Sequence, residues 1–157
     1  MKMRKSNIVL VGLLLAGASL WAQTKDKKQE KPKPKPIPVY LGRSEITDGA
    51  KLTKRAFESL LRQGLTAKDS VGNPYKVEGF AFTYGERNLY EDSVGNLMWV
   101  TDHLVEYNFG DTLSTFLLNN ITGRSKGGDT VYIDNITLRS DTRGGALGRA
   151  LRLVLQK

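Results

Sequence analysis

The chain has 157 residues, no cysteine, a formal net charge of +8 and a pI near 9.7. This length fits one domain with short extensions, and the lack of cysteine excludes both a disulfide framework and a lipoprotein cysteine. The charge does not indicate a nucleic-acid partner, because nearly all of it lies in residues 1–38 and residues 39–157 are almost neutral.

Residues 1–22 have the layout of a secretory signal peptide, with a basic start, an apolar run from Ile8 and small residues near the end. A helix that spans a membrane needs about 20 apolar residues, and this run is shorter. We therefore expect cleavage after Ala22, with a cut after Ala18 or retention as an anchor as alternatives. The sequence predicts an exported, periplasmic protein.

Residues 23–38 form a Lys/Pro-rich linker, with proline at every second position from Pro32. Such a segment cannot bury a core and favours extended polyproline II, at about 3.1 Å per residue. Two interpretations stay open: a solvated spacer, or a tether whose lysines contact an anionic membrane or the cell wall. The folded domain then occupies residues 39–157.

The first half of the domain predicts a short strand near residues 37–42, a helix and a long strand. Thr53 is the expected N-cap of the helix, which ends before Gly64. In the long strand the apolar residues change from odd to even positions between Val77 and Phe80. One extra residue at Glu78 or Gly79 would restore a single buried face, so we expect a β-bulge there.

A hairpin is expected next, because two apolar arms flank a loop with Gly95. The pentapeptide DSVGN occurs at residues 69–73 and again at 92–96, and its flanks differ, so we interpret it as one turn sequence used twice. A strand with Val105, Tyr107 and Phe109 on one face follows. The segment 110–123 then predicts a short helix, capped by Asp111 or Thr112, with a buried stripe of Leu113, Phe116 and Leu117.

In the segment 127–140, GGDTVYIDNITLRS, the apolar residues again change from odd to even positions. Val131 and Ile133 are apolar at odd positions, whereas Ile136 and Leu138 are apolar at even ones. A bulge at Asp134 and Asn135 would place all four on one buried face. The closing segment 147–155 fits a helix and a strand equally well.

No catalytic, cofactor or metal site emerges from the motifs. His103 is the only histidine and has no presented serine or cysteine to pair with. The glycine-rich segment 122–130 lacks the spacing of a phosphate-binding loop. Paired carboxylates are the remaining enzymatic option, and the candidates are Asp129, Asp134, Glu78 and Glu86.

The segments YKVEGFAFTY and GDTVYIDNI give the domain a family likeness. Residues 39–156 resemble the C-terminal periplasmic domain of the gliding-motility protein GldM, part of the type IX secretion core complex. The resemblance implies an immunoglobulin-like β-sandwich with small helices and a closing strand, and it supplies no catalytic residues. The residues that carry it are Val77, Gly79, Phe80, Gly128, Asp129, Val131, Ile133 and Ile136.

These observations predict a non-enzymatic periplasmic module that binds envelope proteins through a β face or edge strand. Binding to a second copy of the chain, as a homodimer, would be one such interaction. No nucleic acid or cofactor is expected. The alternative is a binder of small ligands or cell-wall glycan, with or without hydrolytic activity, that uses Trp99, Tyr90 and Tyr107 as a stacking platform. If these three aromatic residues do not form a platform, we expect them to be buried in the core.

Overall fold

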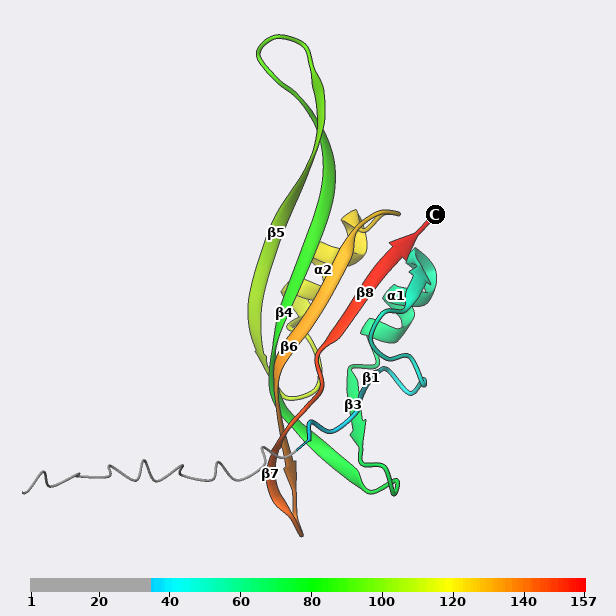
Figure 1. The fold of residues 1–157 in the computed structure, drawn as a ribbon, viewed down its shortest axis with the longest axis vertical. Helices are drawn as coiled ribbons and strands as arrows, with labels where there is room; N and C mark the ends of the chain where they lie inside the picture. Colours follow the sequence, from blue (N-terminus) through cyan, green and yellow to red (C-terminus); the bar gives the residue numbers. More distant parts are fainter. Residues whose placement is uncertain (1–34) are drawn as a thin grey trace, which may run out of the picture. The chain divides into compact units, whose positions relative to one another are not determined.

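The computed structural model describes residues 35–157, so the predicted signal peptide and most of the predicted linker lie outside the described residues. Within this part of the chain, neither helix is long and apolar enough to cross a membrane. Strands dominate and two helices accompany them (Figure 1). This confirms the mainly β fold with small helices.

Eight strands form one curled sheet. Its path runs β1-β3-β4-β6-β8-β2, while β5 pairs with β4 and β7 pairs with β6. Neighbours are antiparallel except for β2 and β8, which are parallel. The strands are β1 (Val39–Leu41), β2 (Lys51–Thr53), β3 (Leu65–Lys68), β4 (Pro74–Glu91), β5 (Leu97–Phe109), β6 (Thr130–Ser140), β7 (Gly144–Leu147) and β8 (Leu151–Gln156).

The immunoglobulin-like sandwich is not confirmed, because the described strands join in a single curled sheet. An isolated bridge brings the segment before β1 to the junction of β7 and β8. There, Ile37 N–H donates to the Leu147 carbonyl at 2.9 Å, and Arg149 N–H donates to the Ile37 carbonyl at 2.8 Å. The closing segment is thus extended, as the resemblance implies, and is divided into β7 and β8.

Both helices pack on the same face of the sheet. Helix α1 (Lys54–Leu61) buries Phe57 and Leu61, and helix α2 (Thr115–Arg124) buries Leu117 and Ile121. These side chains share one apolar core with the inward-facing residues of the strands, among them Val77, Phe80, Phe82, Tyr84, Val131, Ile133, Ile136, Leu138, Leu151, Leu153 and Leu155. This burial is the main source of stability.

Both predicted bulges are present, and they lie opposite each other in neighbouring strands. In the β4–β6 register, Glu78 is the extra residue of β4. The extra length of β6 lies at Asn135 and Ile136, one residue later than predicted, because Asp134 pairs with Ala81. Asn135 has a positive φ of 49°, a conformation that asparagine tolerates better than most residues. The two insertions offset each other, so Val77 and Leu138 remain paired and buried.

The helices confirm one prediction and correct another. Thr53 caps α1, and its side chain accepts from Ala56 N–H. The second helix begins later than expected: Ser114 is its N-cap, in place of Asp111 or Thr112. The predicted buried stripe is wrong at Phe116, which is exposed, whereas Leu113 and Leu117 are buried together with Ile121.

The two DSVGN turns are alike in detail. In each, the aspartate Oδ1 accepts the N–H of the valine and of the asparagine, at 2.8–2.9 Å. In each, the asparagine amide donates to Oδ2, and the glycine has a positive φ. The first turn joins β3 to β4 and the second joins β4 to β5, which supports reuse of one turn sequence.

Candidate protein-binding surface

Strand β5 forms a long free edge of the sheet. It pairs with β4 through thirteen consecutive residue pairs with no bulge, and within residues 35–157 no other strand pairs with it. Natural edge strands are commonly protected by charged side chains, especially lysine, by proline or by a bulge. β5 contains no lysine, proline or bulge, and its charged residues are Asp102 and Glu106, on the inner side. Its backbone is therefore open to another strand.

The outer face of the sheet beside β5 carries exposed aromatic and branched side chains. Phe109 is 86% exposed, Val105 is 63% exposed and Tyr107 is 48% exposed. The Tyr107 ring lies across Gly79, where a Cβ atom would come within 2.6 Å of the tyrosine hydroxyl. Tyr107 also meets Phe109 edge to face, with ring centres 5.3 Å apart. Together they form an apolar strip at the base of β5.

Beyond the end of β6, strands β4 and β5 continue alone as a two-stranded arm, residues 87–101 (Figure 1). Pairing with β6 stops at Gly85 and Thr130. The next free β4 donor, Arg87 N–H, bonds instead to Asp129 Oδ1 at 2.9 Å. Asp129 thus fixes the point at which the arm leaves the body of the sheet.

The arm exposes large apolar side chains on both of its faces. Trp99 is 60% exposed, and the Arg87 guanidinium lies 4.6 Å from the centre of its ring. The other exposed apolar side chains of the arm are Leu89, Tyr90, Val94, Leu97, Met98 and Val100. An isolated two-stranded hairpin is marginally stable in water. An arm with this composition is therefore suited to a partner that covers it.

The aromatic residues predicted as a platform are exposed, and the expectation that they belong to the core was wrong. They do not share one face. The pairs Leu89–Trp99 and Ala81–Tyr107 lie on the outer face, whereas Tyr90 pairs with Met98 on the opposite face. The Tyr90 hydroxyl donates to Asp102 Oδ2 at 2.8 Å. Trp99 and Tyr107 are eight residues apart along β5, roughly 26 Å at strand geometry.

A polar cluster lies on the inner side of β4, where the arm begins. Glu86 is buried and forms ion pairs with Arg124 and Lys126. A cavity of about 210 Å³ beside it is lined by Tyr84, Glu86, Asp102, His103, Leu104 and Arg124. The Asp102 carboxylate accepts hydrogen bonds from the Asn88 amide and the Tyr90 hydroxyl. The bond from Asn88, and to a smaller extent the bond from Tyr90, lowers the pKa of Asp102.

Three of the four candidate carboxylates are engaged by other groups, and two of them, Glu86 and Asp129, both contact Lys126. Asp129 is fully buried and accepts from Tyr84 Oη, Arg87 N–H and Lys126 N–H. Burial is the main reason why the pKa of Tyr84 lies well above its ordinary value, and the hydrogen bond to Asp129 raises this pKa further. Glu78 pairs with Arg139 at 3.4 Å, and Asp134 is exposed beside the β6 bulge.

The signature residues of the resemblance occupy structural positions. The five apolar ones, Val77, Phe80, Val131, Ile133 and Ile136, are buried in the core. Gly79 lies between the two register shifts, and Gly128 has a positive φ of 100° in the turn before β6. Asp129 anchors that turn to β4.

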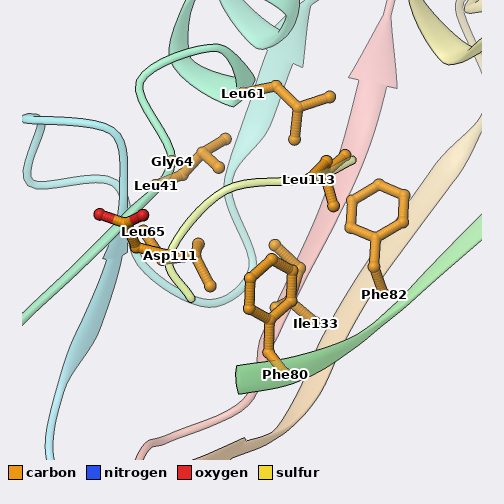
Figure 2. A pocket seen from close by; sticks show the side chains of 9 residues that line it. All are labelled: Leu41, Leu61, Gly64, Leu65, Phe80, Phe82, Asp111, Leu113 and Ile133. Atoms are coloured by element: carbon orange, nitrogen blue, oxygen red, sulfur yellow. The ribbon is translucent and has the colours of Figure 1, made fainter. Parts of the chain in front are cut away.

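A small cavity in the core is too small for an organic ligand. It measures about 10 Å³ and is lined by apolar side chains of β1, α1, β3, β4 and β6 and by Leu113, with Asp111 and Gly64 also at its wall (Figure 2). A single water needs about this volume together with several polar partners. The cavity is therefore a packing gap between the sheet and the loops.

No protein-family model matches the chain, and no curated protein matches its sequence.

Among residues 35–157, no three His, Asp or Glu side chains are grouped so that they could hold a metal ion. His103 lies exposed in the middle of β5. The predicted hairpin is present as the arm, but the sequence did not predict that the arm is exposed or that β5 is the free edge. The one available signal was an apolar strand with neither lysine nor proline.

Proposed function

We propose that this protein is an exported, non-enzymatic module that binds an envelope protein through the β5 edge and the arm. The observation that carries the proposal is the long, unpaired edge strand, free of lysine, proline and bulges, with exposed aromatic side chains beside it. An incoming strand would complete the backbone hydrogen bonds of β5, while its side chains would cover those of the arm and the strip at the base.

The charge distribution supports the same proposal. Residues 39–157 are almost neutral, and the exposed residues of β5 are mainly apolar and aromatic. Aromatic residues are enriched at protein interfaces, where they bury a large area with few rotatable bonds. Membership of the GldM-like group, and its immunoglobulin-like fold, remain part of the proposal. They rest on the buried signature residues and on the two facing bulges.

The two DSVGN turns provide a matched test of the arm. Val94 at the arm tip and Val71 in the β3–β4 turn occupy the same position of the same turn, and both are exposed. We expect Trp99→Glu combined with Val94→Glu to reduce the retention of envelope protein by the immobilised chain at least tenfold. Val71→Glu should leave retention unchanged.

The readout is quantitative mass spectrometry of proteins retained from an envelope extract. Equal retention by all variants would contradict the arm as the binding surface. Pull-downs with and without residues 24–38 show whether the linker contributes.

A glycan-binding function is the second candidate, because Trp99, Tyr90 and Tyr107 are all exposed. Their division between two faces weakens a shared platform, although one ring can stack on one sugar. Co-sedimentation with purified peptidoglycan separates the two candidates. Binding to peptidoglycan that Trp99→Ala abolishes, with no protein retained from the extract, would replace our proposal with this one.

A further inference from the structure

The backbone of β5 has a defined outward face. Asp92 N–H donates to the Asn96 carbonyl at 2.9 Å, and Gly110 N–H donates to the Glu78 carbonyl at 2.8 Å, one bond at each end of the hairpin. Both bonds join even-numbered residues that fit the β4–β5 register. Hydrogen-bonded and non-bonded pairs alternate in an antiparallel ladder. The odd-numbered residues of β5 therefore direct their N–H and C=O groups toward the free edge.

The side chains of these odd-numbered residues form a pattern that is symmetric about His103. Reading outward from His103, Thr101 corresponds to Val105, and Trp99 corresponds to Tyr107. At the ends, Leu97 corresponds to Phe109. All of these residues are exposed on the outer face of the sheet. A strand with this symmetry is complementary to a second copy of itself in antiparallel orientation.

We propose that the occupant of the β5 edge is β5 of a second copy, paired antiparallel about a two-fold axis at His103. This inference rests on the proposed function and names its partner. In this register Leu97 lies opposite Phe109 of the second copy, Trp99 opposite Tyr107, and Thr101 opposite Val105. Aromatic and branched residues that face each other across strands stabilise such a pair.

The inner side of the same register contains no like-charge clash within β5. Met98 lies opposite Asn108 of the second copy, Val100 opposite Glu106, and Asp102 opposite Leu104. Like charges directly opposite each other would destabilise the pair, and the two acidic residues avoid each other. The only histidine faces its own copy at the axis.

The pairing also accounts for the arm. Because the two strands run antiparallel, each arm lies along the base of β5 in the other copy. The order β4-β5-β5-β4 then makes one continuous sheet across the two copies. The exposed two-stranded arm gains a third strand, which supplies the support that an isolated hairpin lacks. Such a two-fold interface closes on itself and leaves no further edge at β5.

The register is tested with a pair of double variants at Thr101 and Val105, both exposed. Thr101 pairs with Arg87 and Val105 pairs with Thr83 within the chain, so both variants should fold. In Thr101→Glu with Val105→Lys, opposite charges meet across the axis; in Thr101→Glu with Val105→Glu, like charges meet. We expect the dissociation constant of the dimer, from analytical ultracentrifugation of the exported full chain, to be at least roughly tenfold higher for the second.

Cross-linking provides a second test, because the chain has no cysteine. In His103→Cys the two thiols would lie on adjacent strands, about 5.5 Å apart between Cα atoms, and a short bis-maleimide should join the copies. In Val94→Cys the thiols lie at opposite ends of the dimer and should not react. Cross-linking of Val94→Cys alone would show that the arms meet tip to tip and would overturn the proposed register.

The outcomes separate this inference from the proposed function. A monomer at every concentration that still retains an envelope protein through the arm would overturn the inference and leave the function standing. A monomer that retains no protein would overturn both. A dimer with equal dissociation constants for the two charge variants would overturn the β5 register.

Discussion

Asp129 shows how one buried side chain can determine the course of two strands. Its carboxylate receives three donors, from Tyr84, Arg87 and Lys126. It therefore joins the turn before β6 to β4 at the root of the arm. The partners lie 42 and 45 residues away in β4, and only three residues away in the turn. No local pattern around Asp129 identifies the two distant ones.

Removal of the Tyr84 hydroxyl should weaken this anchor. Tyr84→Phe keeps the buried ring but deletes the hydrogen bond to the Asp129 carboxylate. We expect the free energy of unfolding to fall by about 1.5–3 kcal/mol, the range for a bond to a charged group. Tyr132→Phe on the half-exposed outer face should change it by less than about 0.5 kcal/mol. Urea unfolding monitored by circular dichroism provides both values.

Asn135 is a second position at which the backbone restricts the side chain. Its positive φ is unfavourable for a branched residue, and the side chain is exposed. Asn135→Val should therefore lower the free energy of unfolding by about 1–2 kcal/mol relative to Asn135→Gly. The same urea titration measures the difference, and equal stabilities would contradict the left-handed conformation in solution.

Asp69 should make stability depend on pH in the acid range. The Asn73 amide, the backbone N–H groups of the turn and Arg143 together lower the pKa of Asp69 from 3.8 to about 2. A lowered pKa in the folded chain stabilises it above pH 4, and this contribution disappears as the pH falls toward 2. The natural chain should therefore lose stability relative to Asp69→Asn across this interval. Thermal unfolding at pH 5, 4, 3 and 2 tests it, and parallel curves would contradict it.

At the scale of the elements, the facing bulges of β4 and β6 act as one unit. Each extra residue shifts the register, and the other restores it. Deletion of Glu78 or Asn135 alone should turn core residues such as Val77 outward. We expect each deletion to lower the free energy of unfolding by roughly 2 kcal/mol or more, the scale for exposing one such side chain. The double deletion should be less damaging than the sum of the two. Additive losses would show that the bulges are independent.

The elements differ in how far the sequence predicts them. Both bulges follow from the alternation of apolar residues, because the buried face of a strand is a local property of its sequence. The predicted start of α2 was wrong because Asp111, Thr112 and Ser114 are all suitable N-cap residues. Only packing of the helix against the sheet selects Ser114. The exposure of β5 was missed for a related reason: whether a face is covered depends on elements distant in the sequence.

For the whole molecule, the composition distinguishes a basic N-terminal segment from nearly neutral residues 39–157. It does not reveal that the strands form one curled sheet with a free edge. Edges are a property of strand order, and strand order depends on pairings such as β2 with β8, about one hundred residues apart. The candidate binding surface therefore emerges only when the complete topology is known.

The position of β8 also has a consequence for when the chain can fold. In the sequence β8 follows every other described strand, yet it lies between β6 and β2 and carries Leu151, Leu153 and Leu155 into the core. The core cannot close until β8 has paired with β6 and β2, and contacts of such long range form slowly. Termination after Arg149 should leave a chain without cooperative thermal unfolding. We therefore expect the described domain to fold in one cooperative step, with β8 included.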